Sequence, residues 1–364
     1  MNVHDLAKSL EEWAPLSYQE SYDNAGLIVG DGKTEVTGIL VSLDCTETVV
    51  EEAVKKNCNV VVSHHPIIFG GLKKLTGSNY VERTVMKALT NNVALYAIHT
   101  NLDNIKTGVN HRIADRLDLE NRRILSPKRG HLRKLVVFCP HDHVETVRTS
   151  LFNAGAGAIG DYDECSFNLR GEGTFRGLEN SHAFVGEKGK RHTEPETRIE
   201  VIYPVEKQGR ILSAMISAHP YEEVAHDIYA LDNSDYEVGS GLIGTLSAPV
   251  DEKEFLAFLK ERINTKCIRH TPFRNKSVQK IALCGGSGSF LLGAAKRAEA
   301  DVFITGDFKY HEFFDAEGEI LIADVGHYES EQFTIPLLID YLREKFPTFA
   351  VHFTEVNTNP INYF

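Results

Sequence analysis

The stretch from Asn59 to Pro66 sets the strongest limit on how this chain can fold. Three valines lead into two adjacent histidines, His64 and His65, and then into a proline, which cannot continue a central strand. Because side chains alternate between the faces of a strand, neighbouring histidines can face one ligand only where the chain leaves the sheet. Sites in open α/β sheets commonly lie at such exits. The alternative is that one histidine bonds to a loop backbone and the other is solvated.

The residues around this stretch follow a strand–helix–strand pattern. The expected elements are strands at 38–44 and 59–64, a helix over 46–56, a helix near 81–89 and a strand over 93–98. This alternation predicts βαβ units and a parallel sheet. Polar residues again follow the last of these strands, at His99 and Asp103.

The carboxyl-terminal part repeats the pattern. Its expected elements are a strand at 280–284, a glycine loop at 285–289, a helix over 290–298 and a strand over 301–307. One offset of 242 residues places Ile39 over Ile281, Val60 over Val302 and His65 over Asp307. A shorter offset of 228 residues places His99 over His327. We predict a duplicated α/β architecture with two lobes; the alternative is a chance alignment of two generic βαβ units.

The middle of the chain has a different order of elements. We expect strands at 135–139, 198–203 and 223–229, helices over 141–154 and 207–217, and segments at 165–169 and 174–176 that flank a glycine-containing turn. The order β-α-β-β-α-β predicts a ferredoxin-like α+β insert, followed by a linker at 231–244. The predicted domains are therefore 1–131 and 236–364, two parts of one α/β domain, and the insert 132–235. We interpret His219 to Glu223 as a plain turn, with a regulatory or interface surface as the alternative.

Composition excludes several classes of function. The net charge of −12, with acidic and basic residues mixed, argues against a dedicated binder of duplex nucleic acid but leaves room for a local pocket for a small anion. The six scattered cysteines are typical of reduced core thiols. Residues 3–13 predict a helix without the pattern of a signal peptide, and the chain lacks an apolar run of membrane-spanning length. We expect a soluble cytoplasmic protein.

Four groups of polar residues could take part in chemistry. They are His64 with His65, His99 with Asp103, Asp307 with His311, and His327 with Glu331. The last pair is four residues apart, so both side chains lie on one face of a predicted helix. Nitrogen and carboxylate ligands without thiolates suit zinc, manganese, iron, cobalt or nickel rather than calcium. Five or six ligands exceed the need of one tetrahedral ion, so we predict two metals and hydrolytic chemistry.

The glycine loop is a second candidate site. Backbone amides of Gly285, Gly286, Ser287 and Gly288 could bind an anion at a strand-to-helix turn. The spacing matches neither a P-loop nor a dinucleotide-binding fingerprint. A glycine turn required only by tight packing is the alternative.

The motifs together resemble the family of GTP cyclohydrolase I type 2 homologues, also called Nif-three-like proteins. The matching segments are 22–27, Ser63 to Phe69, His99 to Asp103, Thr305 to Asp307 with His311, and Gly326 to Glu331. Segments 154–160 and 219–223 resemble the PII-like insert of the longer bacterial members. In the family, paired histidines often follow the Gly-Asp; here Tyr310 precedes His311, which weakens the case for His311.

The resemblance implies a ligand set and an assembly. The implied metal ligands are His64, His65, Asp103, His327 and Glu331, with His99 close to the site. Two divalent ions per subunit are implied, with zinc as the first choice, in a toroidal homohexamer whose sites face an internal cavity. We expect a metal-dependent hydrolase, of cyclohydrolase or phosphoesterase type, acting on a nucleotide-like or phosphorylated small molecule. The alternative is a non-catalytic, metal-loaded ring that acts through its PII-like insert on a ligand or partner.

Overall fold

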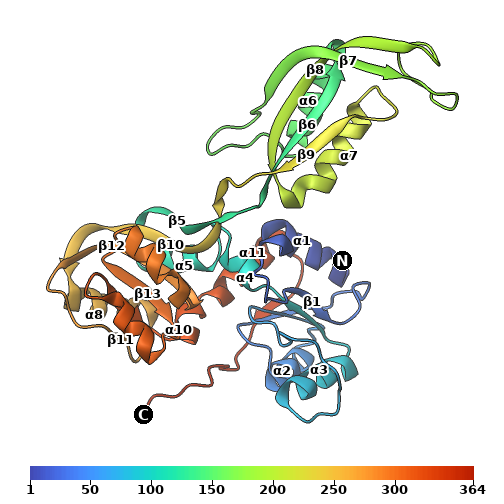
Figure 1. Ribbon diagram of the computed structural model, residues 1–364. Helices are drawn as coiled ribbons and strands as arrows, with labels where there is room; N and C mark the ends of the chain where they lie inside the picture. The colour runs from blue at the N-terminus through green and yellow to red at the C-terminus, as the bar shows by residue number, and fades with distance from the viewer. The chain divides into compact units, whose positions relative to one another are not determined.

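The computed structural model describes residues 1–364, which divide into two compact units. Unit 1 comprises residues 1–127 and 237–364, and unit 2 comprises residues 128–236. The chain leaves unit 1 along β5 (Glu120–Arg129) and re-enters it along β10 (Ser234–Asp251) (Figure 1). No helix is long and apolar enough to span a bilayer.

The linker predicted over residues 231–244 is wrong, because most of it belongs to β10. Val238 and Leu242 in this segment are buried. The glycines that suggested a loop are required by neighbouring strands: a Cβ at Gly239 would lie 2.2 Å from the carbonyl oxygen of Ser126. Close backbone approach therefore explains a composition that resembles a flexible connection.

The first sheet of unit 1 has five strands in the order β1-β4-β3-β2-β15. Their bounds are β1 (Gly26–Val29), β2 (Ile39–Ser42), β3 (Val60–Ser63), β4 (Ala94–Ala97) and β15 (Val351–Phe353). All neighbours pair in parallel except β1 with β4. The predicted parallel βαβ arrangement is confirmed here.

Helices cover both faces of this sheet, which explains why β2, β3 and β4 are buried throughout. Leu40 and Val61 pack in a cluster with α2 (Glu47–Lys55) and α3 (Tyr80–Thr90). Val60 and Val62 point to the other face, whose cluster includes α1 (Val3–Trp13). Fully burying one such valine contributes roughly 1.5–3 kcal/mol, so the strand before the histidines is firmly held.

The second sheet of unit 1 has six strands in the order β11-β14-β13-β12-β10-β5. The remaining bounds are β11 (Arg269–His270), β12 (Ser277–Ser287), β13 (Val302–Gly306) and β14 (Leu321–Asp324). The strands β12, β13 and β14 are parallel, with Ile281 opposite Val302. The strand predicted at 280–284 continues to Ser287, which pairs with Gly306. The predicted helix over 290–298 is reduced to a 3-10 turn and α9 (Leu292–Arg297).

One hydrophobic cluster joins the two sheets of unit 1. It contains Val60 and Val62 of the first sheet and Val302 and Ile304 of the second. The other helices of this unit are α4 (Thr100–Asp103), α5 (Val109–Arg116), α8 (Glu252–Ile263), α10 (His327–Glu331) and α11 (Thr334–Lys345). Apolar residues of α5, α8 and α11 complete the cluster, so both sheets share one core.

Unit 2 has the predicted order of elements, β-α-β-β-α-β. They are β6 (Leu132–Pro140), α6 (Val144–Asn153), β7 (Phe167–Arg176), β8 (Arg191–Pro204), α7 (Gln208–Ala218) and β9 (His226–Ala230). The sheet is antiparallel, in the order β7-β8-β6-β9. The turn predicted between 169 and 174 is wrong, because β7 runs unbroken along β8 and includes both of its glycines as strand residues.

Candidate metal centre

Four histidines follow strand ends from both sheets of unit 1. His64 and His65 follow β3, His99 follows β4, and His327 begins α10 shortly after β14. The carboxyl ends of parallel strands lie at one edge of a sheet, and a shared core joins the two sheets. The fold therefore brings together side chains that lie more than 260 positions apart, such as His65 and His327.

The turn before α10 requires a glycine. Gly326 has φ 96° and ψ 151°, a conformation that side-chain-bearing residues rarely adopt. A Cβ on this residue would also lie 2.3 Å from Oε2 of Glu329. The turn starts α10 at His327, so His327 and Glu331 lie one helical turn apart on the same face.

Three side chains form the tightest part of the site. Oε2 of Glu331 lies 2.9 Å from Nε2 of His65 and 3.0 Å from Nε2 of His327. The two imidazole nitrogens lie 3.2 Å from each other. Glu331 is 2% exposed, so this contact among two nitrogens and a carboxylate lies inside the protein.

His64 and Asp103 extend the site on the other side of Glu331. Nε2 of His64 lies 3.6 Å from Oε1 of Glu331 and 3.7 Å from Oδ1 of Asp103. Both Nε2 of His64 and Oδ1 of Asp103 are buried without a hydrogen-bond partner. Unpaired buried polar atoms are costly and rare in native proteins. A cation between them would satisfy both, so these residues fit a metal.

A second layer of acceptors orients every imidazole. Nδ1 of His64 lies 2.9 Å from the carbonyl oxygen of Ile98. The Nδ1 atoms of the other three rings lie close to carboxylate oxygens: His65 to Asp44 (2.8 Å), His99 to Asp23 (2.7 Å) and His327 to Asp307 (2.6 Å). An N–H donated from Nδ1 leaves the lone pair on Nε2. This is the usual arrangement of metal-binding histidines, whose other nitrogen bonds to a carboxylate or carbonyl.

The surrounding carboxylates hold protons on two of the rings. Burial lowers the pKa of His65, but hydrogen bonds to Asp44 and Glu331 outweigh it and raise this pKa to about 9. Burial also lowers the pKa of His327, but hydrogen bonds to Asp307 and Glu331 outweigh this effect and raise the pKa to about 11. Metal-binding imidazoles are neutral, so a bound cation would take the place of these protons.

The remaining ionisable groups respond mainly to burial. Burial lowers the pKa of the His64 imidazole. Burial, followed by the charge of Glu331, raises the pKa of Asp103 well above its ordinary value. Burial also opposes ionisation of Glu331, but hydrogen bonds from the histidines lower its pKa well below the usual range. Without a cation, the site therefore resists a second negative charge beside Glu331.

The three predicted near-site residues have different positions. The His99 ring lies 5.3 Å from that of His64 and 5.4 Å from that of His65, at the border of the cluster. Three groups of side chains could hold a metal: His64 with His65 and His99, His65 with His327 and Glu331, and His64 with Asp103 and Glu331. Asp307 lies behind His327, as its hydrogen-bond partner. His311 is exposed and stacks on Phe314, and it belongs to none of the three groups that could hold a metal.

The glycine loop does not offer free amides. The amide of Gly285 donates to Asn110, that of Gly286 to Ser330 and that of Gly288 to Thr305, each at 2.9 Å. A Cβ on Gly286 would lie 2.2 Å from Oε1 of Glu331. Side chains thus already use three of the four amides in the predicted anion site of Gly285, Gly286, Ser287 and Gly288, and Gly286 packs against the candidate ligand Glu331.

Sequence reasoning missed Asp23 and Asp44. Asp23 also accepts from the amide of Thr100 at 3.0 Å, and Asp44 accepts from the hydroxyl of Thr358 at 2.6 Å. Hydrogen bonds to His99 and Thr100 outweigh the effect of burial on Asp23 and lower its pKa to about 2. The sequence does contain a signal for Asp44, which follows the end of β2, next to the strand β3 that precedes His64.

The sequence has relatives of matching length. The profile of the family Duf34/NIF3 (NGG1p interacting factor 3) matches residues 1–360. A Bacillus subtilis protein named GTP cyclohydrolase 1 type 2 homolog is 34% identical over 368 residues, covering 100% of this chain and 99% of the relative. A Halalkalibacterium halodurans protein of the same name is 37% identical, over 90% of this chain and 88% of the relative.

Solved structures agree with the sequence matches. A Bacillus cereus protein related to NIF3 superposes with a TM-score of 0.86 at 35% identity, covering 100% of this chain and 99% of its own. A Staphylococcus aureus protein superposes with a TM-score of 0.79 at 30% identity and the same coverage. Fold and sequence match along the whole chain, and the protein is thus a member of the DUF34/NIF3 family.

Proposed function

We propose that unit 1 binds two divalent metal ions, for which Glu331 would offer one carboxylate oxygen each. One set of ligands is His65, His327 and Oε2 of Glu331, and the other is His64, Asp103 and Oε1 of Glu331. The ligand atoms within each set lie within 4.8 Å of one another, which supports the assignment. The observation that supports it most is the pair of buried, unpartnered atoms on His64 and Asp103. The donors suit zinc first, with iron, manganese, cobalt or nickel as alternatives.

The reaction that we propose is hydrolysis of a nucleotide-like or phosphorylated small molecule. Two bound divalent ions stabilise a developing oxyanion and lower the pKa of water. The protein's own part is to orient the ligands through Asp44 and Asp307. His99, held by Asp23, lies at the border of the site, where it would contact a bound substrate. The name of the relatives, GTP cyclohydrolase 1 type 2 homolog, supports a nucleotide-like substrate.

We also propose a history for the fold. The two sheets of unit 1 would derive from one duplicated α/β unit, supported by the equivalent parallel pairs Ile39–Val60 and Ile281–Val302. Residues 132–235 would be a ferredoxin-like, PII-like insert between 1–131 and 236–364. The strand order β7-β8-β6-β9, in which the first and third strands are central, supports that assignment.

The alternative function is a non-catalytic, metal-loaded ring. In this case the chain would form a toroidal homohexamer, and unit 2 would bind a ligand or partner. The separate core of unit 2 supports an independent role for this unit. Light scattering should give six times the chain mass of 40.6 kDa, and a monomer mass would contradict the assembly.

A turnover assay separates the two functions. Protein of known metal content would be tested against GTP and a panel of phosphoesters. The hydrolase proposal predicts turnover that disappears in His65→Ala and persists in the matched control His311→Ala, with the oligomer intact in both. Absence of turnover in fully loaded protein across the panel would favour the non-catalytic ring.

A further inference from the structure

Unit 2 contains a cavity of about 900 Å³ that has no part in the proposed metal centre. Leu169 and Phe138 both pair with Arg198 across the sheet, so these three lining residues point to one face. The alternating residues Ile199 and Val201 pack in the core with α6 and α7. The cavity therefore lies over the sheet face that the helices leave uncovered.

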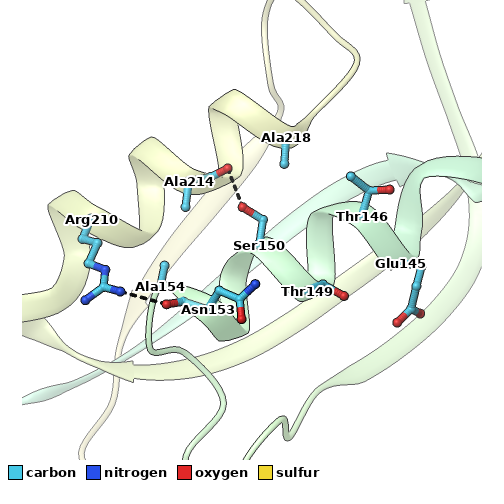
Figure 2. A pocket seen from close by; sticks show the side chains of 9 residues that line it. All are labelled: Glu145, Thr146, Thr149, Ser150, Asn153, Ala154, Arg210, Ala214 and Ala218. Atoms are coloured by element: carbon cyan, nitrogen blue, oxygen red, sulfur yellow. Dashed lines mark hydrogen bonds between the residues drawn. The ribbon is translucent and has the colours of Figure 1, made fainter.

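A second hollow in unit 2 has a different character. It measures about 650 Å³ and lies between α6 and α7 (Figure 2). The hydroxyl of Ser150 donates to the carbonyl oxygen of Ala214 at 3.0 Å, and Arg210 donates to that of Asn153 at 2.8 Å. These contacts tie the two helices together.

Two glycines open the floor of the 900 Å³ cavity. Gly171 and Gly173 alternate with other residues of β7 and lie on the same face as Leu169. Glycine weakens a strand, and it often marks a place where another group approaches the backbone. A Cβ on Gly173 would lie 2.1 Å from Oε2 of Glu196, whereas a Cβ on Gly171 would meet nothing within 4 Å. The first glycine thus leaves open space, and the second makes room for a carboxylate.

Glu196 is the buried charge of this cavity. It is 8% exposed, and its Oε1 accepts a hydrogen bond of 2.8 Å from the hydroxyl of Tyr221. A carboxylate has about four lone-pair sites, so this one can still accept several N–H groups. A buried carboxylate without a cationic partner is costly, and a bound cation would relieve the cost.

Aromatic rings line the space next to this carboxylate. The Tyr221 ring lies 6.1 Å from that of Phe175 and 6.2 Å from that of Phe184. The loop that contains Phe184 is held by a hydrogen bond of 2.7 Å from the amide of His182 to Glu222. Aromatic faces attract cations and pack well against flat groups. The nearby Arg198 forms an ion pair of 2.9 Å with Glu200, and its Nε is buried without a hydrogen-bond partner.

We propose that this cavity binds a flat organic cation with N–H donors, of the amidine or guanidine type. Glu196 would accept its N–H groups, and Tyr221 and Phe175 would contact its faces. The proposal goes beyond the metal-centred function and does not depend on it. A planar cation can donate two parallel, charge-assisted hydrogen bonds to a carboxylate. A neutral or anionic ring of the same shape cannot form this pair of bonds.

Three probes of one shape test the charge preference. The metal-loaded full-length chain would be titrated with benzamidine, benzamide and benzoate, followed by ligand-observed NMR. We expect benzamidine to bind about tenfold more tightly than benzamide, with no binding of benzoate. Equal binding of benzoate and benzamidine, or no binding of any probe, would overturn the proposal.

Variants of unit 2 locate the binding. Glu196→Gln should weaken benzamidine binding about tenfold, while Glu172→Gln, which removes an exposed carboxylate at the rim, should leave it unchanged. Gly171→Leu should fill the open space and abolish binding while the far-UV circular dichroism is retained. This second variant decides the matter if Glu196→Gln does not fold. Benzamidine binding that survives in Gly171→Leu would place the site elsewhere.

Discussion

Removing metal should destabilise unit 1 by an amount that the site geometry sets. Nε2 of His64 and Oδ1 of Asp103 are buried without a partner among the protein's own groups. Each such group costs about 1–3 kcal/mol, so bound ions should raise the free energy of unfolding by roughly 2–6 kcal/mol. At about 2–4 °C per kcal/mol for a unit of this size, the midpoint of unfolding should fall by roughly 4–24 °C on chelation.

Scanning calorimetry of chelated and zinc-reloaded protein measures this difference. The effect of chelation should be fully reversed by zinc. His311→Ala should show the same shift as the unsubstituted chain, because His311 lies outside the three candidate groups. Equal midpoints with and without metal would refute the reasoning that these two atoms await a cation.

Three further predictions test separate parts of the structure. Glu331→Gln should lower the metal content measured by elemental analysis below two ions per chain, and an unchanged content would remove Glu331 from the ligand set. Gly326→Ala should destabilise the protein in urea by about 1–3 kcal/mol, because φ is 96° there and Glu329 blocks a Cβ; an unchanged midpoint would contradict this. Hydrogen bonds from the amides of Thr76 and Ser78 lower the pKa of Glu82 from 4.5 to about 2. The ionised carboxylate should therefore keep its loop ordered above pH 4.5, and this order should be lost as the pH falls towards 2. Hydrogen-exchange protection of the loop amides measures this; Glu82→Gln should abolish the pH dependence, and its persistence would exclude Glu82 as the cause.

The parallel part of the fold could be predicted because its signals are local. Runs such as Val60 to Ser63, bounded by turn residues, identify buried strands, and helices between them imply parallel pairing. The errors lie where tertiary contacts override composition. Gly239 resembles a loop residue in sequence, yet it lies in a strand because β5 comes close to its backbone. The unbroken course of β7 through Gly171 depends in the same way on its partner β8.

The candidate site was predictable to a similar degree. The histidines and carboxylates at strand ends are visible in the sequence, and the structure brings four histidines together with Glu331 and Asp103. The second layer of acceptors could not be predicted, because an aspartate that orients a histidine ring lies at no fixed distance from that histidine in the sequence. Asp23 lies 76 positions from His99. The use of the Gly286 amide by Ser330, 44 positions away, was hidden for the same reason.

Anomalous diffraction from crystals of the zinc-loaded protein would locate the bound ions. We expect two peaks per chain, one among His65, His327 and Glu331 and the other among His64, Asp103 and Glu331. Crystals of zinc-saturated protein without a peak at these side chains, or with ions bound only elsewhere, would contradict this expectation.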